Sequence, residues 1–251
     1  MLTVERQTAI VELLRQRGRV LANDLSAELG VSADTIRRDL RELDELGLLR
    51  RVHGGALPRT GDAAPFAARA RRAPEAKASI ARRAAELIHD GQVVILDGGT
   101  TTVEVARALR PNLRATIVTT SPPVAVALSE HHGVDIAVIG GTLRRDALVT
   151  VGAETVDALR MIRADVVMLG VCGLHPELGV TANDLEETQV KRAMINGAAA
   201  VVALADHDKL GTARPVFVAP IDVITALITD SDVNDQSLDP YRAAGIEVLY
   251  A

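Results

Sequence analysis

The segment 31–55, VSADTIRRDLRELDELGLLRRVHGG, decides the fold of the N-terminal part of the chain. Its apolar residues recur at helical spacing and predict one amphipathic helix over residues 33–46. They are Ile36, Leu40, Leu43 and Leu46. Ser32 stands in the N-cap position, although Thr35 replaces the Glu or Gln that would complete a capping box. Gly47 then ends the helix, and LLRRVHGGA indicates two short strands that form a basic wing.

Two shorter helices are predicted before this one. Their inner faces are formed by Ile10, Leu13, Leu14, Leu25 and Leu29. Gly18 ends the first helix, and Gly30 occupies the tight turn before the helix at 33–46. Three short helices with such a turn match helix-turn-helix geometry, in which the last helix enters the major groove of DNA. We therefore expect a winged helix-turn-helix domain over residues 1–57.

The polar face of the 33–46 helix is rich in arginine. Because successive helical residues are about 100° apart, Arg37, Arg38 and Arg41 fall opposite the apolar stripe. Residues 1–57 contain nine Arg and nine acidic residues, so net charge alone would also fit a solvated helix face. The convergence of the arginines on one face and the wing favours DNA binding. The residues expected to contact DNA are Ser32, Thr35, Arg37, Arg38, Arg41, Arg51 and His53.

This segment resembles the DeoR family of bacterial regulators. The similarity to the family's winged helix-turn-helix covers essentially all of residues 4–57. Its most specific motifs are TIRRDL and RVHGGA. The resemblance implies a transcription factor whose downstream part decides when it holds DNA.

Length and composition place the chain among small intracellular proteins. Its 251 residues suffice for one small and one medium domain, and 48% of them are hydrophobic. The single cysteine, Cys172, excludes an internal disulfide and suits a reducing compartment. The start MLTVERQTAIVELL lacks the basic region of a signal peptide, and no apolar run approaches the roughly 20 residues of a membrane span. We expect a soluble, cytoplasmic protein.

The net charge of −5 is unevenly distributed along the chain. Residues 1–57 sum to zero, residues 58–90 to +3 and residues 91–251 to −8. An acidic C-terminal part would repel DNA, so the DNA contact is expected in the N-terminal module.

Residues 58–74 contain three prolines and no clean hydrophobic period, which predicts a linker. Its Arg69, Arg71 and Arg72 could touch the DNA backbone, or they could simply be solvated.

From residue 75 onward, helices and apolar strands alternate. The predicted helices are 75–89, 101–110, 123–131, 153–162 and 184–197, and the predicted strands are 93–96, 115–119, 134–140, 165–170, 199–205, 224–229 and 246–250. This alternation predicts an α/β domain with a mostly parallel sheet over residues 75–251. Ligands of such sheets bind beyond the carboxyl ends of the strands.

Glycine and hydroxyl residues follow several of these strands. Glycines let the backbone approach an anion, and hydroxyls and helix N-terminal N–H groups can bond phosphate oxygens. One such loop would indicate no more than a turn, but several at successive strand ends predict a shared anion pocket. The expected residues are Asp97, Gly98, Gly99, Thr100, Thr101, Thr120, Ser121, Gly140, Gly141, Arg144 and Gly170.

Charged residues farther along add to this pocket. Glu187 and Lys191 lie near the start of the 184–197 helix, and Asp206 and Lys209 follow the next strand. Lys209 could neutralise a phosphate, and Asp206 or Glu187 could accept sugar hydroxyls. The acidic helix start also fits a simpler interpretation, because carboxylates are favourable near helix N-termini. No metal-ligand spacing, GxxxxGK[ST] or GxGxxG is present, so neither a metal nor a cofactor is expected.

This second half also resembles the C-terminal sensor domain of the DeoR family, over about residues 75–230. The matching segments are LDGGTTTVEVARAL, VTTSPPVAVAL, VIGGTLRRDALVTVG, GVTANDLEETQVKRAM and ALADHDKLG. The resemblance implies a sensor similar in fold to ribose-5-phosphate isomerase, with phosphorylated sugars or related metabolites as effectors. Gly98 stands where the family often has Ser, which removes one hydroxyl from the loop and leaves its backbone.

Together, these expectations predict that the protein represses a sugar catabolic operon. A phosphorylated sugar is expected to release it from DNA. One module reads too few base pairs for selectivity, so we expect a dimer or larger homo-oligomer. The alternative is an enzyme, related to sugar-phosphate isomerases or lactonases, that carries a DNA-binding domain. Its candidate acid, base and electrophile are Asp97, Asp206, Glu187 and Lys209, and fold analogy alone supports it.

Overall fold

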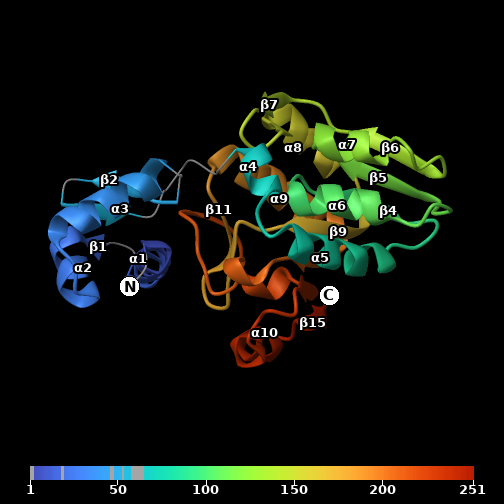
Figure 1. Ribbon diagram of the computed structural model, residues 1–251. Coiled ribbons are helices and arrows are strands. Elements are labelled where there is room, and N and C mark those ends of the chain that lie inside the picture. Colours follow the sequence, from blue (N-terminus) through green and yellow to red (C-terminus); the bar gives the residue numbers. More distant parts are fainter. Residues whose placement is uncertain (1–2, 18–19, 46–47, 53, 58–64) are drawn as a thin grey trace. The chain divides into compact units, whose positions relative to one another are not determined.

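The computed structural model describes residues 3–17, 20–45, 48–52, 54–57 and 65–251. The chain divides into two compact units, Met1–Ala64 and Pro65–Ala251 (Figure 1).

The first unit consists of three helices and a small antiparallel sheet. Its elements are α1 (Thr3–Arg17), β1 (Val20–Leu21), α2 (Ala22–Leu29), α3 (Ala33–Glu45), β2 (Arg50–Val52) and β3 (Gly55–Leu57). The three predicted helices and the two wing strands are confirmed. The sequence did not indicate β1, which pairs with β3 through Val20 and Ala56 and so completes the sheet order β1-β3-β2. A two-residue strand is too short to show a hydrophobic period.

The apolar stripe of α3 forms the centre of this unit. Ile36, Leu40 and Leu43 are buried in one cluster with Ile10 of α1 and Leu25 of α2. Gly30 ends α2 with φ of 66°, a left-handed conformation that glycine adopts without strain, so the chain can turn tightly into α3. The predicted helix end at Gly47 lies outside the described residues.

The second unit is built on a seven-stranded sheet in the order β15-β14-β12-β9-β4-β5-β6. These strands are β4 (Val93–Leu96), β5 (Ala115–Thr119), β6 (Val134–Val138), β9 (Ala164–Gly170), β12 (Ala198–Leu204), β14 (Ala226–Thr229) and β15 (Glu247–Tyr250). All neighbouring pairs are parallel, as the alternating pattern predicts. The carboxyl ends of the strands therefore lie along one edge of the sheet.

Helices cover both faces of this sheet (Figure 1). They are α5 (Pro74–Glu86), α6 (Thr100–Ala108) and α7 (Pro122–Leu128) on one face, and α8 (Ala153–Arg160), α9 (Leu185–Gly197) and α10 (Asp239–Ala243) on the other. Val94 and Leu96 face the first helix group and Ile95 the second, because strand side chains alternate. Burial on both faces explains why these strands are continuous apolar runs.

Five short strands lie outside the main sheet. They are β7 (Thr142–Arg144) and β8 (Val149–Val151), which form a hairpin, and β10 (Gly173–His175), β11 (Gly179–Ala182) and β13 (Val216–Ala219), which form an antiparallel sheet. The sequence placed these segments in loops, because three or four residues carry no clear alternation.

The predicted linker 58–74 extended too far. Residues 66–74 belong to the second unit, where they form helix α4 (Phe66–Ala70) and lead into α5. The Phe66 backbone N–H donates to the Asp146 carbonyl oxygen at 3.0 Å, and the Phe66 ring packs against the core beneath α5 and α6. A five-residue helix gives no period to detect, and residues 58–64 lie outside the described part.

The described helices include none with the length and hydropathy of a membrane span.

Candidate functional site

The exposed face of α3 carries the residues expected to contact DNA. Ser32 caps the helix, because its hydroxyl accepts the Thr35 backbone N–H at 3.2 Å and lies 2.8 Å from the Thr35 hydroxyl. Arg37 pairs with Asp34 at 2.7 Å and Arg38 with Glu42 at 3.2 Å. These are exposed surface pairs of small strength, which a phosphate or a base edge can replace.

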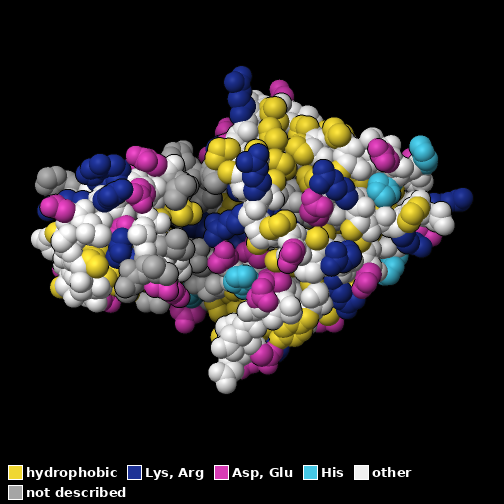
Figure 2. All heavy atoms as spheres, in the orientation of Figure 1, with side chains coloured by type: hydrophobic (Ala, Val, Ile, Leu, Met, Phe, Trp, Pro, Cys, Tyr) yellow, Lys and Arg dark blue, Asp and Glu magenta, His cyan; other side chains and the backbone are white. Residues whose placement is uncertain are grey.

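Arg41 is also exposed on α3, and Arg51 is exposed on strand β2 of the wing. His53 lies outside the described residues. Basic and acidic side chains are interspersed on the visible face of this unit (Figure 2), in keeping with its balanced charge.

A buried ion pair fixes α3 against α1. The Arg6 guanidinium donates to both carboxylate oxygens of Asp39, from Nε at 2.6 Å and from Nη2 at 3.0 Å. Asp39 is the fifth residue of TIRRDL and lies on the side of α3 that faces inward. The amino-acid sequence gives no sign of this role, because the two residues are 33 positions apart and no local pattern joins them.

The loop after β4 approaches the hairpin β7–β8 closely. A Cβ atom on Gly98 would overlap Cγ1 of Val149 and would lie 3.4 Å from Cβ of Ser121. Gly98 therefore has no room for a side chain unless Val149 moves. The following residues Thr100 and Thr101 begin α6 and are buried.

Asp97 and Lys191 form an ion pair in the interior below this loop. Asp97 accepts the Lys191 ammonium and also the backbone N–H groups of Gly98 at 2.7 Å and Gly170 at 3.0 Å. Lys191 also donates to the Gly170 carbonyl oxygen at 2.8 Å and lies 3.6 Å from Glu187. Burial alone would lower the pKa of Lys191, but the charges of Asp97 and Glu187 outweigh it and hold that pKa above its usual value. The pair thus joins β4, β9 and α9.

Thr120 and Ser121 lie fully buried at the carboxyl end of β5. The Ser121 hydroxyl donates to the Leu148 carbonyl oxygen at 3.2 Å. The Thr120 hydroxyl is buried and has no hydrogen-bond partner among the described residues.

Gly140 and Gly141 pack against α8. The Gly140 carbonyl oxygen accepts the Thr155 hydroxyl at 2.7 Å, and a Cβ on Gly141 would overlap that hydroxyl. Close packing on α8 is thus a sufficient reason for glycine at position 141.

Arg144 is held by two carboxylates. It donates to Asp146 at 2.9 and 3.2 Å and pairs with Asp184, the N-cap residue of α9. The Arg144 guanidinium lowers the pKa of Asp146 below its usual range. Arg144 therefore braces the β7–β8 turn against α9, and its charge is already neutralised.

Further charged groups gather around the end of β12. Lys209 lies 3.5 Å from Oδ2 of Asp206, whose Oδ1 is buried without a described partner. Burial, followed by the nearby charge of Lys209, lowers the pKa of Lys77 to about 8. The Lys77 ammonium donates to the carbonyl oxygens of Arg69 and Arg72. Lys77 was not among the predicted site residues, because a lysine on an amphipathic helix gives no signal that it is buried.

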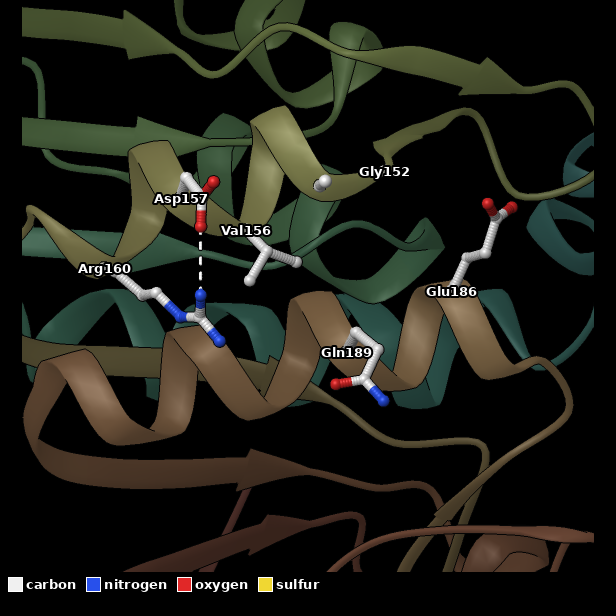
Figure 3. Close-up of a pocket in the computed structure, with 7 residues that line it drawn as sticks. Gly152, Val156, Asp157, Arg160, Glu186 and Gln189 are labelled. Carbon is white, nitrogen blue, oxygen red and sulfur yellow. Dashed lines mark hydrogen bonds and ion pairs between the residues drawn. The ribbon is translucent and has the colours of Figure 1, made fainter.

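A separate groove of about 330 Å³ lies between α8 and α9. It is lined by Gly152, Ala153, Val156, Asp157, Arg160, Glu186 and Gln189, and it contains none of the expected effector residues (Figure 3). Arg160 is paired with Asp157 at 2.9 Å, so the groove offers an anion no free cation among its lining residues.

His207, Asp230 and Asp232 bring three potential metal-ligand atoms within 4.8 Å of one another. Nδ1 of His207 lies 2.7 Å from Oδ2 of Asp230, and this hydrogen bond raises the pKa of His207. This hydrogen bond is by itself a sufficient reason for the closeness of His207 and Asp230. The sequence did not indicate the group, because 23 positions separate His207 from Asp230.

Comparison with known proteins identifies both units. Residues 6–60 match the family described as DeoR-like helix-turn-helix domain, and residues 72–231 match the DeoR C terminal sensor domain. The HTH-type transcriptional regulator GlpR of Haloferax volcanii is 38% identical, over 99% of this chain and 98% of its own length. The glycerol-3-phosphate regulon repressor of Escherichia coli K12 is 36% identical, over 90% of both chains.

Solved structures are more distant. The sorbitol operon regulator SorC of Klebsiella pneumoniae has a TM-score of 0.44 at 10% identity, covering 96% of this chain and 99% of its own. Ribose 5-phosphate isomerase A of Methanocaldococcus jannaschii has a TM-score of 0.40 at 18% identity and covers 54% of both chains. These TM-scores are too low to support any statement about the ligand or the activity of this chain. The sequence matches, which span both units in order, establish that this chain is a DNA-binding transcriptional regulator of the DeoR family.

Proposed function

We propose that this regulator represses a sugar catabolic operon and that a phosphorylated sugar, bound at the carboxyl edge of the parallel sheet, releases it from DNA. Two relatives carry names that fit this role: the Escherichia coli glycerol-3-phosphate regulon repressor and the Bacillus subtilis transcriptional repressor GlcR, which is 36% identical over 98% of this chain.

The observation that carries the proposal is the set of unsatisfied polar groups at the strand ends. The Thr120 hydroxyl and Oδ1 of Asp206 are buried without a described partner, and each such group costs free energy unless something bonds it. A sugar hydroxyl can satisfy either atom. Lys77 and Lys209 supply positive charge beside the same edge, where a phosphate would be neutralised.

The loop after β4 supplies the backbone for this site. Thr100 begins α6, so the first N–H groups of that helix face the space beyond the strand ends and can bind an anion. Asp97 and Lys191 support the loop from below and, being paired with each other, are expected to hold its shape and not to contact the phosphate.

The same pair argues against an enzyme. A general base needs a free lone pair aimed at substrate, whereas Asp97 accepts Lys191 and two backbone N–H groups. Together with the relatives, which are named as regulators, this supports a sensor without turnover. Incubation with sugar phosphates, followed by NMR, should show no product.

On the DNA side, we propose that α3 enters the major groove and that the wing contacts the backbone or minor groove. Two copies of the chain would then read two half-sites about one helical turn apart. Light scattering of the purified chain should give a homo-oligomer, and a single half-site should bind more weakly than two in register.

The decisive experiment measures binding of the full chain to labelled DNA from upstream of its own gene by fluorescence anisotropy. Glycerol 3-phosphate, glucose 6-phosphate and fructose 1-phosphate are then added, each beside its unphosphorylated counterpart. At least one phosphate ester should release the DNA, and the matched polyol or sugar should not. Release by none of a broad panel of phosphate esters would contradict the proposed effector class.

Lys209→Ala tests the site itself. The variant should hold the operator as tightly as the unmodified chain, but it should need roughly tenfold to a hundredfold more effector for release, because one charge-assisted bond is lost. Arg107→Ala, which removes an exposed cation of α6 paired with Glu104, is the matched control and should change neither quantity. An unchanged effector response in Lys209→Ala would remove Lys209 from the site.

A further inference from the structure

Helix α4 is the first element of the second unit after residues 58–64, and few contacts hold it. It has five residues, no side-chain cap and no buried residue. Among the described residues, its backbone bonds to the rest of the unit are the Phe66 N–H to Asp146 and the Arg69 carbonyl oxygen, which accepts the Lys77 ammonium. The Arg72 carbonyl, just after the helix, accepts the same ammonium. Arg72 adds an ion pair with Asp208 at 2.7 Å.

Arg69 on this helix is partly buried and has unused hydrogen-bonding capacity. Its Nε is buried and has no partner among the described residues. One terminal nitrogen donates to the Asp146 carbonyl oxygen at a long 3.4 Å, and the guanidinium lies over the Phe66 ring, 5.8 Å from its centroid. A guanidinium has five donors arranged to bind carboxylate or phosphate in a fork, so this one is poorly satisfied by the protein alone.

The surroundings of Arg69 are the strand ends described above. The Arg69 carbonyl oxygen accepts Lys77, whose own charge is opposed by Lys209. Burial and the nearby Glu187 carboxylate raise the pKa of Cys172, the residue two positions after β9, and the charges of Lys191, Lys209 and Arg69 oppose this rise. Helix α4 also packs against α6, the helix that begins at Thr100 (Figure 1). Three cationic side chains therefore lie near one another at the strand ends, those of Arg69, Lys77 and Lys209. Of these, Lys209 is paired with Asp206.

We propose that Arg69 binds the anionic group of the effector, and that α4 is the element through which effector binding reaches the DNA-binding unit. The proposal rests on the proposed function and adds a residue and a route to it. An anion bound between Arg69, Lys209 and the start of α6 would tie α4 to the strand ends. Because α4 directly follows residues 58–64, fixing it fixes the point from which the first unit is tethered.

The test uses the full chain, inorganic phosphate as the probe and three variants. Arg69→Gln removes the guanidinium, Arg69→Lys keeps the charge but not the fork, and Arg71→Gln removes an exposed arginine of the same segment as the matched control. Phosphate affinity is measured by calorimetry. Hydrogen exchange of the α4 amides is measured with and without phosphate, because a residue that only stabilises the fold would not make this exchange depend on phosphate.

Phosphate should slow exchange in α4 in the unmodified chain and in Arg71→Gln. Arg69→Gln should bind phosphate roughly tenfold to a hundredfold more weakly and should lose this protection, with Arg69→Lys in between. Equal affinity and equal protection in Arg69→Gln would overturn the role of Arg69 and α4 and leave the sensor site standing. Absence of binding by the unmodified chain, both to phosphate and to every sugar phosphate, would instead overturn the proposed function itself.

Discussion

At the scale of single residues, the arginines of this chain divide by what they already hold. Arg6 and Arg144 form ion pairs with carboxylates and have a structural role. Arg37 and Arg38 carry only exposed helix-surface pairs, and Arg69 has a buried nitrogen without a described partner. Residue type and position in a motif do not distinguish a structural arginine from one that is available to bind a ligand. The side-chain contacts of each arginine do.

Arg38→Ala is predicted to weaken operator binding. Its side chain is 80% exposed and gives up only a surface pair with Glu42 on meeting DNA. A lost base contact should cost about 1–3 kcal/mol and relax specificity at one base pair, whereas a lost phosphate contact should weaken all sequences alike and reduce the salt slope by about 1. Anisotropy titrations at several salt concentrations distinguish the two.

Arg107→Ala again serves as control and should bind the operator normally. If Arg38→Ala holds the operator as tightly as the unmodified chain, the recognition face has been placed on the wrong side of α3.

The site residues show what a sequence can and cannot supply. The glycine and hydroxyl loops were visible because each follows an apolar strand, and a parallel sheet brings strand ends together. The pairs Arg6–Asp39 and His207–Asp230 were invisible, because each joins segments distant in sequence. Arg69 was assigned to a linker, since nothing local distinguishes a partly buried guanidinium from a solvated one.

At the scale of elements, prediction succeeded where a segment was long enough to show its period. The strand at 93–96 and the helix at 184–197 appear within a residue of their expected bounds. Strands β7 and β10 were missed because each has three residues and is held by pairing with a neighbour, not by its own pattern.

Asp39→Ala is predicted to loosen the packing of α3 on α1. The substitution leaves Arg6 without its buried partner, which is strongly unfavourable. Far-UV circular dichroism, which reports both units, should show part of the thermal unfolding shifted to lower temperature. Operator binding should weaken because α3 is no longer fixed. Asp34→Ala removes an exposed acid from the same helix and should leave both nearly unchanged. Equal melting of the two variants would show that the buried pair is dispensable.

Lys191→Ala is predicted to destabilise the second unit by about 3–5 kcal/mol, the usual cost of leaving one partner of a buried pair uncompensated. The substitution removes the side chain that connects α9 to β4 and β9. Lys191 on α9 donates to Asp97, which follows β4, and to the Gly170 carbonyl oxygen of β9. Urea unfolding measures the loss. The double variant Asp97→Asn/Lys191→Met removes both charges and should recover part of it. A midpoint unchanged by Lys191→Ala would refute this account.

At the scale of the whole molecule, the two units can be followed separately in one sample. Both tyrosines, Tyr241 and Tyr250, lie in the second unit, and the chain has no tryptophan. Tyrosine fluorescence therefore reports unfolding of the second unit alone, while circular dichroism reports both.

The stability of the second unit is predicted to depend on His207 through pH. The hydrogen bond with Asp230 raises the pKa of His207, so the folded state holds this proton more tightly than the unfolded state. The resulting stabilisation is fully present below the unfolded pKa of about 6.5 and is lost as pH rises through the higher folded pKa. Urea midpoints from tyrosine fluorescence should fall more steeply across this window in the unmodified chain than in His207→Gln. The control His132→Gln, at an exposed position, should keep the steeper fall; equal slopes in all three proteins would contradict the assignment.

The contact between Gly98 and Val149 also constrains how such a chain can change over generations. A β-carbon at 98 would overlap the γ-methyl of Val149, which is buried and cannot swing away freely. A substitution of Gly98 by serine is therefore expected to be tolerated better after the residue at 149 has become smaller, for example alanine. The reverse order passes through a crowded intermediate, so the effects of the two substitutions on stability are expected to depend on each other.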